Sequence, residues 1–117
     1  IDERISLLER CIKKSNVKID TYNGLLVEYA KNKGAVAIVK GLRAVSDFDW
    51  EFQQSLTNKS LNPGVETVFL TARGENMFLS SSMVKEVCSL GGDISSFVPS
   101  SIADDIYKRC KGDNKND

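Results

Sequence analysis

The sequence predicts an α/β fold in which helices flank a parallel sheet. Apolar runs at residues 35–39 and 66–71 indicate short strands, and segments with helical spacing of apolar residues lie before, between and after them. Strands that alternate with helices in this way are typical of parallel strands joined by helical crossovers. The 117 residues, 41% of them hydrophobic, are enough for one domain with a modest core. We therefore expect one domain over residues 1–110 and a disordered tail, rich in Lys, Asn, Asp and Gly, over residues 111–117.

The chain begins in a predicted helix. Ile1, Ile5, Leu8 and Ile12 recur at helical spacing, and acidic residues in the first turn favour the helix dipole. No Ser, Thr, Asp or Asn precedes Ile1 to cap this helix. Because a native start would more often supply a cap and a disordered lead-in, we expect the chain to be the later part of a longer polypeptide.

The next elements are a strand candidate at residues 17–21 and a helix at residues 24–33. The side chains of this helix that we expect to face the core are Leu25, Leu26, Tyr29 and Ala30. Gly34 then ends the helix, since glycine is favoured directly after a helix. The unbroken apolar run at residues 35–39 is typical of a central strand of a parallel sheet, buried on both faces.

The second half of the chain continues the alternation. Asp47 is predicted to cap a helix that ends near residue 61, before the turn sequence Asn-Pro-Gly at residues 62–64. The strand at residues 66–71 leads into a loop at residues 72–79. Helices are then predicted at residues 81–90, closed by Gly91-Gly92, and at residues 100–110.

Two strand-to-helix junctions carry residues suited to binding an anion. The first contains Lys40, Gly41 and Arg43 in a predicted loop, where a glycine lets the backbone approach a phosphate and two cations offset its charge. The second contains Ser80, Ser81 and Ser82, whose hydroxyls and backbone N–H groups at a helix start can bind phosphate oxygens. A serine triplet by itself is more often a helix cap, and two surface cations are more often simply solvated.

The helix between these junctions places Glu51 and Asn58 on one face, because seven residues make two helical turns. A solvated stripe is one reading of this face. In the other, Glu51 accepts from a sugar hydroxyl or supports Arg43, and Asn58 offers a donor and an acceptor to a polar substrate. The residues expected to pack are Phe48, Trp50, Phe52 and Leu56, with Trp50 the best candidate for a subunit contact.

Composition excludes several classes of function. With 16 Lys and Arg against 16 Asp and Glu, no global positive field attracts nucleic acid. The three cysteines form no C-x-x-C pair, so we expect neither a disulfide framework nor a zinc site, and a reducing cytoplasm fits best. No apolar run approaches the roughly 20 residues that span a bilayer, and no signal peptide opens the chain. The absence of histidine removes the commonest general base.

Three stretches of sequence form recognisable motifs: YNGLLVEYA at residues 22–30, GLRAVSDF at 41–48 and FLSSSMVKEV at 78–87. With NPGVETVFL at residues 62–70 between the second and third, they resemble bacterial phosphopantetheine adenylyltransferases over nearly the whole chain. The resemblance implies a Rossmann-like nucleotidyltransferase fold and a cytoplasmic homohexamer. It implies transfer of the adenylyl group of ATP to 4′-phosphopantetheine, with Mg²⁺, giving dephospho-coenzyme A and pyrophosphate in coenzyme A biosynthesis.

The resemblance also implies roles for individual residues. Those that hold ATP would be Gly41, Arg43, Glu51, Leu79, Ser80, Ser81 and Ser82. Those on the side of the pantetheine substrate, or of the product dephospho-coenzyme A or coenzyme A, would be Leu26, Lys40, Asn58 and Glu86. The catalytic cations would be Lys40, facing the incoming phosphate, and Arg43, facing the phosphates of ATP; no residue is implied as a metal ligand.

The chain also departs from the family pattern. Lys40 and Asn76 stand where the family usually has arginine and an aromatic residue, and a point ammonium is not equivalent to a planar guanidinium at a phosphate. The family's N-terminal strand–helix–strand portion, with its Gly-x-Phe-Asp-Pro turn and catalytic histidine, is not present, so we expect these residues to match the C-terminal two-thirds of a member and to be nearly inactive alone. The alternatives are a non-catalytic nucleotide-binding module, a related nucleotidyltransferase with another substrate, and a structural trimerisation domain.

Overall fold

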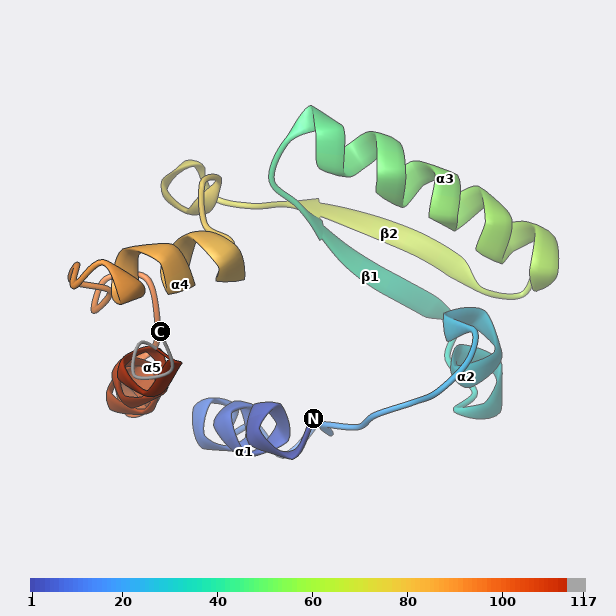
Figure 1. Ribbon diagram of the computed structural model, residues 1–117. Coiled ribbons are helices and arrows are strands. Elements are labelled where there is room, and N and C mark those ends of the chain that lie inside the picture. The colour runs from blue at the N-terminus through green and yellow to red at the C-terminus, as the bar shows by residue number, and fades with distance from the viewer. Residues whose placement is uncertain (114–117) are drawn as a thin grey trace. The chain divides into compact units, whose positions relative to one another are not determined.

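A computed structural model describes residues 1–113 of the chain (Figure 1). Its elements, in chain order, are α1 (Asp2–Cys11), α2 (Leu26–Asn32), β1 (Ala37–Leu42), α3 (Val45–Leu61), β2 (Glu66–Thr71), the 3₁₀ helix η1 (Gly74–Asn76), α4 (Ser81–Ser89) and α5 (Ser100–Asp113). The chain divides into two compact units. The sheet unit is Thr21–Phe78, and the helical unit is Ile1–Asp20 together with the described residues from Leu79 onward.

The sheet unit contains β1 and β2, which pair in parallel, as the sequence predicts. In the register, Val39 lies opposite Val68 and Lys40 lies opposite Phe69. Because successive side chains of a strand point to opposite faces, Lys40 and Phe69 share one face and the two valines share the other. Helix α3 covers the first face (Figure 1), where the ring of Phe48 meets that of Phe69 edge-on at 5.8 Å between centroids.

The other face of this sheet is exposed in the described residues. Val39, Val68 and Leu70 are 62%, 44% and 59% exposed. The prediction that residues 35–39 are buried on both faces is therefore wrong here, and β1 alternates between half-buried and exposed side chains along most of its length. β1 also begins and ends later than predicted, so Lys40 and Gly41 belong to the strand and not to a loop.

Helix α2 buries most of the predicted stripe, since Leu26 and Tyr29 are half-buried and Ala30 is buried, but it also buries Val27, which was not predicted. Val27 and Ala30 are buried at 2% and 4% exposure, whereas Leu25 is the residue before the helix and is 56% exposed. The helix ends at a glycine in the left-handed region, Gly34, with φ of 67°. Two backbone bonds close this end, from Gly34 N–H to the carbonyl of Lys31 and from Ala35 N–H to that of Ala30.

The helical unit has a packed core between α4, α5 and the segment that joins them. Cys88, Ile94 and Cys110 are its buried members, and Ile94 is fully buried. Partly buried apolar side chains surround them: Val84, Val87, Phe97, Val98, Ile106 and Tyr107. None of the three cysteines forms a disulfide in the described chain.

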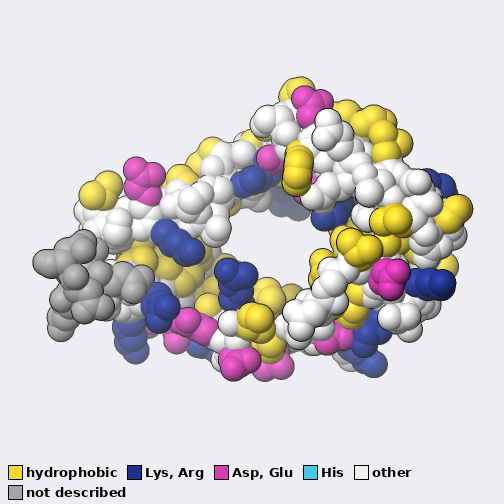
Figure 2. Space-filling view, turned by 45° about the vertical axis from the view of Figure 1, so that its right-hand side comes forward, with side chains coloured by type: hydrophobic (Ala, Val, Ile, Leu, Met, Phe, Trp, Pro, Cys, Tyr) yellow, Lys and Arg dark blue, Asp and Glu magenta, His cyan; other side chains and the backbone are white. Residues whose placement is uncertain are grey.

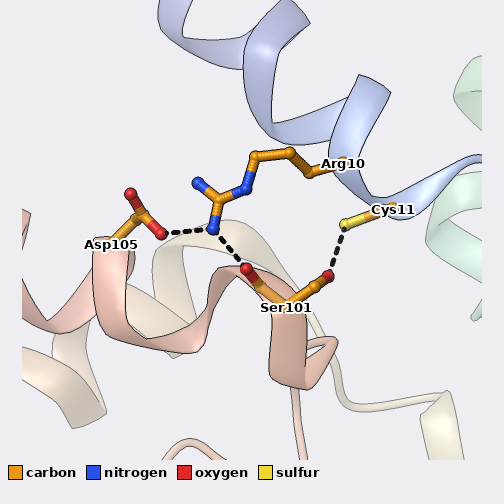
Figure 3. A network of polar contacts seen from close by, with 4 residues as sticks. All are labelled: Arg10, Cys11, Ser101 and Asp105. Carbon is orange, nitrogen blue, oxygen red and sulfur yellow. Dashed lines mark hydrogen bonds and ion pairs between the residues drawn. The ribbon is translucent and has the colours of Figure 1, made fainter.

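Helix α1 contacts α5 within the same unit through a polar network (Figure 3). Arg10 Nη2 donates to the carbonyl of Ser101 and lies 2.8 Å from Asp105 Oδ2, and Cys11 Sγ lies 3.7 Å from Ser101 Oγ. The hydrogen bond from Arg10 is the main cause that lowers the pKa of Asp105 below its usual range. This network ties the end of α1 to the first two turns of α5.

Three further predictions can be compared with the structure. No strand forms at residues 17–21, because no strand among the described residues pairs with this segment. Helix α5 continues to Asp113, three residues into the predicted tail, and residues 114–117 lie outside the described residues. No helix in the described part of the chain is long and apolar enough to cross a membrane.

The surface mixes apolar and charged side chains. Figure 2 shows Lys and Arg interspersed with Asp and Glu on the face that it draws, and apolar side chains exposed between them. On α3, Trp50 is 62% exposed and Leu56 55% exposed, so neither is buried within the described chain, and a subunit contact at Trp50 stays a prediction. Phe48 and Phe52 do stack on each other, with centroids 5.4 Å apart.

Candidate functional site

The first candidate site is the junction between β1 and α3, formed by Lys40, Arg43, Asp47 and Glu51. Lys40 lies in β1 on the face covered by α3, and Arg43 follows directly after the strand. Helix α3 begins at Val45, with the extended residue Ala44 before it and no side-chain cap. Asp47 is thus the third residue of the helix, and the prediction that it caps the helix start is wrong.

Asp47 instead binds Arg43, two residues before the first residue of the helix. Its Oδ2 accepts a hydrogen bond from the backbone N–H of Arg43 at 3.2 Å and another from Arg43 Nε at 3.1 Å. The side chains of Arg43 and Asp47 are 42% and 30% exposed. The hydrogen bond from the Arg43 side chain is the main cause that lowers the pKa of Asp47, so the carboxylate stays ionised to lower pH than usual.

Glu51 pairs with the other cation of the junction. Its Oε2 lies 3.2 Å from Lys40 Nζ, and the two side chains are 23% and 26% exposed. This oxygen is buried and makes no hydrogen bond in the described residues, so the contact is an ion pair without hydrogen-bond geometry. The structure thus pairs Glu51 with Lys40 and Arg43 with Asp47, and the interpretation in which Glu51 supports Arg43 stays a prediction.

The two carboxylates of the junction lie on one face of α3. Asp47 and Glu51 are four residues apart on α3, and residues at this spacing lie on the same face of a helix. The two cations that they contact are three residues apart at the end of β1. The sequence predicts both cations and Glu51 as site residues, whereas it predicts Asp47 only as a helix cap.

The remaining predicted residues of the sheet unit are more scattered. Gly41 lies on the exposed face of the sheet, opposite Leu70, and a Cβ atom built on it would meet nothing within 4 Å. Packing among the described residues therefore does not require glycine at this position. Asn58 is half-buried two turns beyond Glu51 on α3, as predicted, and Leu26 is the first residue of α2.

The second candidate site is the N-terminus of α4, in the helical unit. Ser80 is the residue before the helix, and its Oγ accepts a hydrogen bond from the backbone N–H of Met83 at 3.1 Å. Ser80 Oγ also lies 3.2 Å from Ser82 Oγ, and Ser81 and Ser82 are exposed. Ser80 is thus a helix cap, as the more general interpretation of the triplet predicts, while Leu79 is half-buried directly before it.

The first turn of α4 nevertheless keeps the features of an anion site. N–H groups of a first helical turn have no partner within the helix, and the helix dipole makes this end partly positive. Ser81 and Ser82 add exposed hydroxyls at the same place. This arrangement can bind phosphate oxygens with neutral donors, whereas the β1–α3 junction offers charged ones.

Glu86, predicted on the substrate side, lies at a pocket of the helical unit that the sequence did not predict. The pocket has a volume of about 530 Å³, and side chains of α1, α4 and α5 line it, among them Arg4, Lys85, Glu86 and Ile106. These helices are far apart in the sequence, so no local pattern reveals the pocket. The structure thus groups Lys40, Arg43 and Glu51 in the sheet unit, and the serines and Glu86 in the helical unit.

Comparisons with known proteins give consistent results. A family model described as cytidylyltransferase-like matches residues 1–87. A phosphopantetheine adenylyltransferase of Caldanaerobacter subterraneus subsp. tengcongensis is 52% identical over 112 residues, which are 95% of this chain and 70% of that protein.

Two further relatives carry the same name. The protein from Alkaliphilus metalliredigens is 48% identical over 93% of this chain and 70% of its own length. The protein from Dictyoglomus turgidum is 50% identical over 95% of this chain and 70% of its own length. The match covers most of the length of each relative. That this chain corresponds only to the C-terminal two-thirds of a family member is therefore not supported and stays a prediction.

Proposed function

The chain belongs to the phosphopantetheine adenylyltransferase family, and we propose that it transfers the adenylyl group of ATP to 4′-phosphopantetheine in coenzyme A biosynthesis. The products would be dephospho-coenzyme A and pyrophosphate. The observation that carries this proposal is identity of about half the residues with enzymes of that name over 93–95% of the chain. The geometry of the β1–α3 junction is compatible with it, because two cations lie at the end of one strand.

The proposed reaction needs no activated side chain. A phosphate oxygen of 4′-phosphopantetheine forms a bond to the α-phosphorus of ATP, and the bond from this phosphorus to the bridging oxygen breaks. The electron pair of the broken bond leaves with pyrophosphate. Because the attacking phosphate is already an anion, the protein contributes position and charge stabilisation.

The two cations of the junction would divide this task. Lys40 would face the phosphate of 4′-phosphopantetheine, and Arg43 would face the phosphates of ATP. Each already has a carboxylate of α3 as its partner, so neither cation is left without a counter-charge when no phosphate is bound. A phosphate would then be bound by side chains that are already held in place.

The other predicted residues would complete the two substrate sites. Gly41, Glu51, Leu79 and the serines at residues 80–82 would bind ATP, the serines through hydroxyl and backbone groups at the start of α4. Leu26, Asn58 and Glu86 would lie on the pantetheine side. These roles come from the position of each residue in the family motifs.

We also propose that Mg²⁺ enters with ATP. The described residues contain no group of three or more His, Cys, Asp or Glu side chains that could hold a metal ion by themselves. Mg²⁺ usually keeps several waters and is bound by substrate phosphates with one or two carboxylates. The ion would neutralise phosphate charge. A homohexamer, a cytoplasmic location and low activity of these residues alone stay predictions.

Pyrophosphate release from the full-length protein tests the proposed function. Release should require ATP and 4′-phosphopantetheine together, with neither one sufficient. Release with ATP and nicotinate mononucleotide in place of 4′-phosphopantetheine would show a different substrate. ATP binding without any release would instead favour a non-catalytic nucleotide-binding protein.

A further inference from the structure

Asp47 makes two contacts with Arg43 that together restrict the arginine side chain. One oxygen of the carboxylate accepts from the backbone N–H of Arg43 and from its Nε. These bonds close a ring that runs from the backbone nitrogen of Arg43 along its side chain to Nε and back through Asp47 Oδ2. Rotation about the side-chain bonds inside this ring would break one of the two bonds, so the pair of contacts selects one conformation of Arg43.

We propose that Asp47 is a positioning residue for adenylyl transfer, which fixes the direction of the Arg43 guanidinium before ATP binds. This inference rests on the proposed function, in which Arg43 meets the phosphates of ATP. A long arginine side chain loses much rotational freedom when it is fixed, and prior fixing removes that cost from the binding step. Groups that are already in place are also the ones that stabilise a transition state most effectively.

The position of Asp47 in the fold supports this role. It lies in the first turn of α3, a helix of 17 residues that packs on the face of the sheet containing Lys40, so its backbone is held by a long element. A site supported by a helix is more rigid than one supported by a loop. Glu51, one turn further along the same helix, contacts Lys40, so α3 supplies a partner to each cation.

A purely structural role is the competing explanation. The backbone N–H of Ala44, the residue before the helix, also helps to lower the pKa of Asp47, so this carboxylate favours the start of α3 as well. A structural role would change stability and would act whether or not Arg43 is present. A positioning role would act through Arg43 alone.

A double-mutant cycle on the full-length protein separates the two explanations. Asp47→Asn keeps an acceptor for backbone N–H groups but removes the charge that holds Nε. We expect kcat/KM for ATP to fall roughly 10- to 100-fold, the order that a misplaced catalytic group costs, with a melting temperature close to that of the unchanged protein. In an Arg43→Ala background, Asp47→Asn should cause no further loss.

Two more variants make the test specific. Asp49→Asn removes one negative charge from an exposed position of the same helix and should leave kcat/KM unchanged. Asp47→Glu keeps the carboxylate and should recover much of the rate lost in Asp47→Asn. The proposal is overturned if Asp47→Asn matches the unchanged protein, or if its loss is equally large without Arg43.

The failure of this inference can be distinguished from failure of the proposed function. If the unchanged protein releases no pyrophosphate, the proposed function fails. Calorimetry with ATP on the same four proteins of the cycle then still tests Asp47. A loss of ATP affinity that depends on Arg43 supports the positioning role, and a loss independent of Arg43 overturns it.

Discussion

The two candidate phosphate sites of this chain are built in different ways. At the β1–α3 junction, two cations pair with carboxylates of one helix, and all four charged side chains are partly exposed. At the start of α4, the donors are backbone N–H groups and serine hydroxyls, and Ser80 caps the helix. The first site therefore depends on side-chain ion pairs, and the second depends on the integrity of a helix.

The two sites also differ in how deeply the helix that carries each one is buried. Helix α4 contributes Cys88 to the packed core of its unit, in which Ile94 is fully buried. Helix α3 contributes no buried residue, and the sheet beneath it has one exposed face. We therefore expect substitutions in the core to affect the α4 site most, and substitutions of charge to affect the β1–α3 site most.

The largest effect is expected from Ile94→Ala, which should lower the free energy of unfolding by about 2–5 kcal/mol, as truncations of buried Ile commonly do. Urea unfolding measures this change. Hydrogen exchange should become faster at the Met83 amide, which is bonded to Ser80 Oγ, because α4 packs on this core. Leu90→Ala, at an 81% exposed position, is the control and should change stability by less than about 0.5 kcal/mol. If both variants lost the same free energy of unfolding, the buried core would not be what supports the α4 site, and this difference from the β1–α3 site would not hold.

Arg43→Ala should weaken ATP binding by about 1.5–3 kcal/mol, because a charged hydrogen bond to phosphate is lost. The affinity for 4′-phosphopantetheine should change less, since Lys40 is the cation assigned to that substrate. Calorimetry on the full-length protein measures both. Arg73→Ala is the matched control, because this arginine is 85% exposed and lies in the loop after β2. An unchanged ATP affinity in Arg43→Ala would contradict the assigned role.

Ser80→Ala should cost about 1 kcal/mol of stability, the usual value of a lost serine cap. ATP affinity should fall as well, since the first turn of α4 would be less well ordered. Chemical unfolding measures the first effect and calorimetry the second. Ser60→Ala replaces an exposed serine of α3 and should have neither effect. Full stability in Ser80→Ala would show that the cap is not what maintains this site.

The smallest effect is expected for acid, which protonates the carboxylate of an ion pair and leaves neutral hydrogen bonds unchanged. The hydrogen bond from Arg10 lowers the pKa of Asp105 below the ordinary 3.8, so the folded state binds fewer protons there than the unfolded state. The stabilisation is complete above about pH 3.8 and is lost as the pH falls through the lower folded-state pKa. Asp105→Asn should therefore flatten the fall of stability between pH 5 and pH 2 (roughly the range over which paired carboxylates titrate). Asp104→Asn, at an exposed neighbouring position, makes the same change of net charge and is the control.

The regular elements were predictable where local signals agreed. β2 has the predicted bounds because a run of β-branched and apolar residues follows a turn at Asn62. Helix α4 starts at the predicted Ser81 because a capping serine precedes an apolar pattern. Both signals lie within a few residues of the element that they define.

The errors arise where distant residues decide the outcome. A segment such as residues 17–21 becomes a strand only if another strand pairs with it, and its sequence does not contain that information. The sequence predicts Lys40 in a loop, but the pairing of β1 with β2 continues through it to Leu42. Asp47 carries the correct residue type for a cap, yet its partner is Arg43, and the choice between the two depends on the path of the chain before α3.

Trp50, the single tryptophan of the chain, gives the β1–α3 junction a natural optical reporter. It stands beside Glu51 in α3 and is 62% exposed, so its indole is in contact with water. Its fluorescence arises from one known position, and changes around α3 can be followed in the unlabelled protein. The junction can thus be observed during titration with nucleotide without a dye and without a change of sequence.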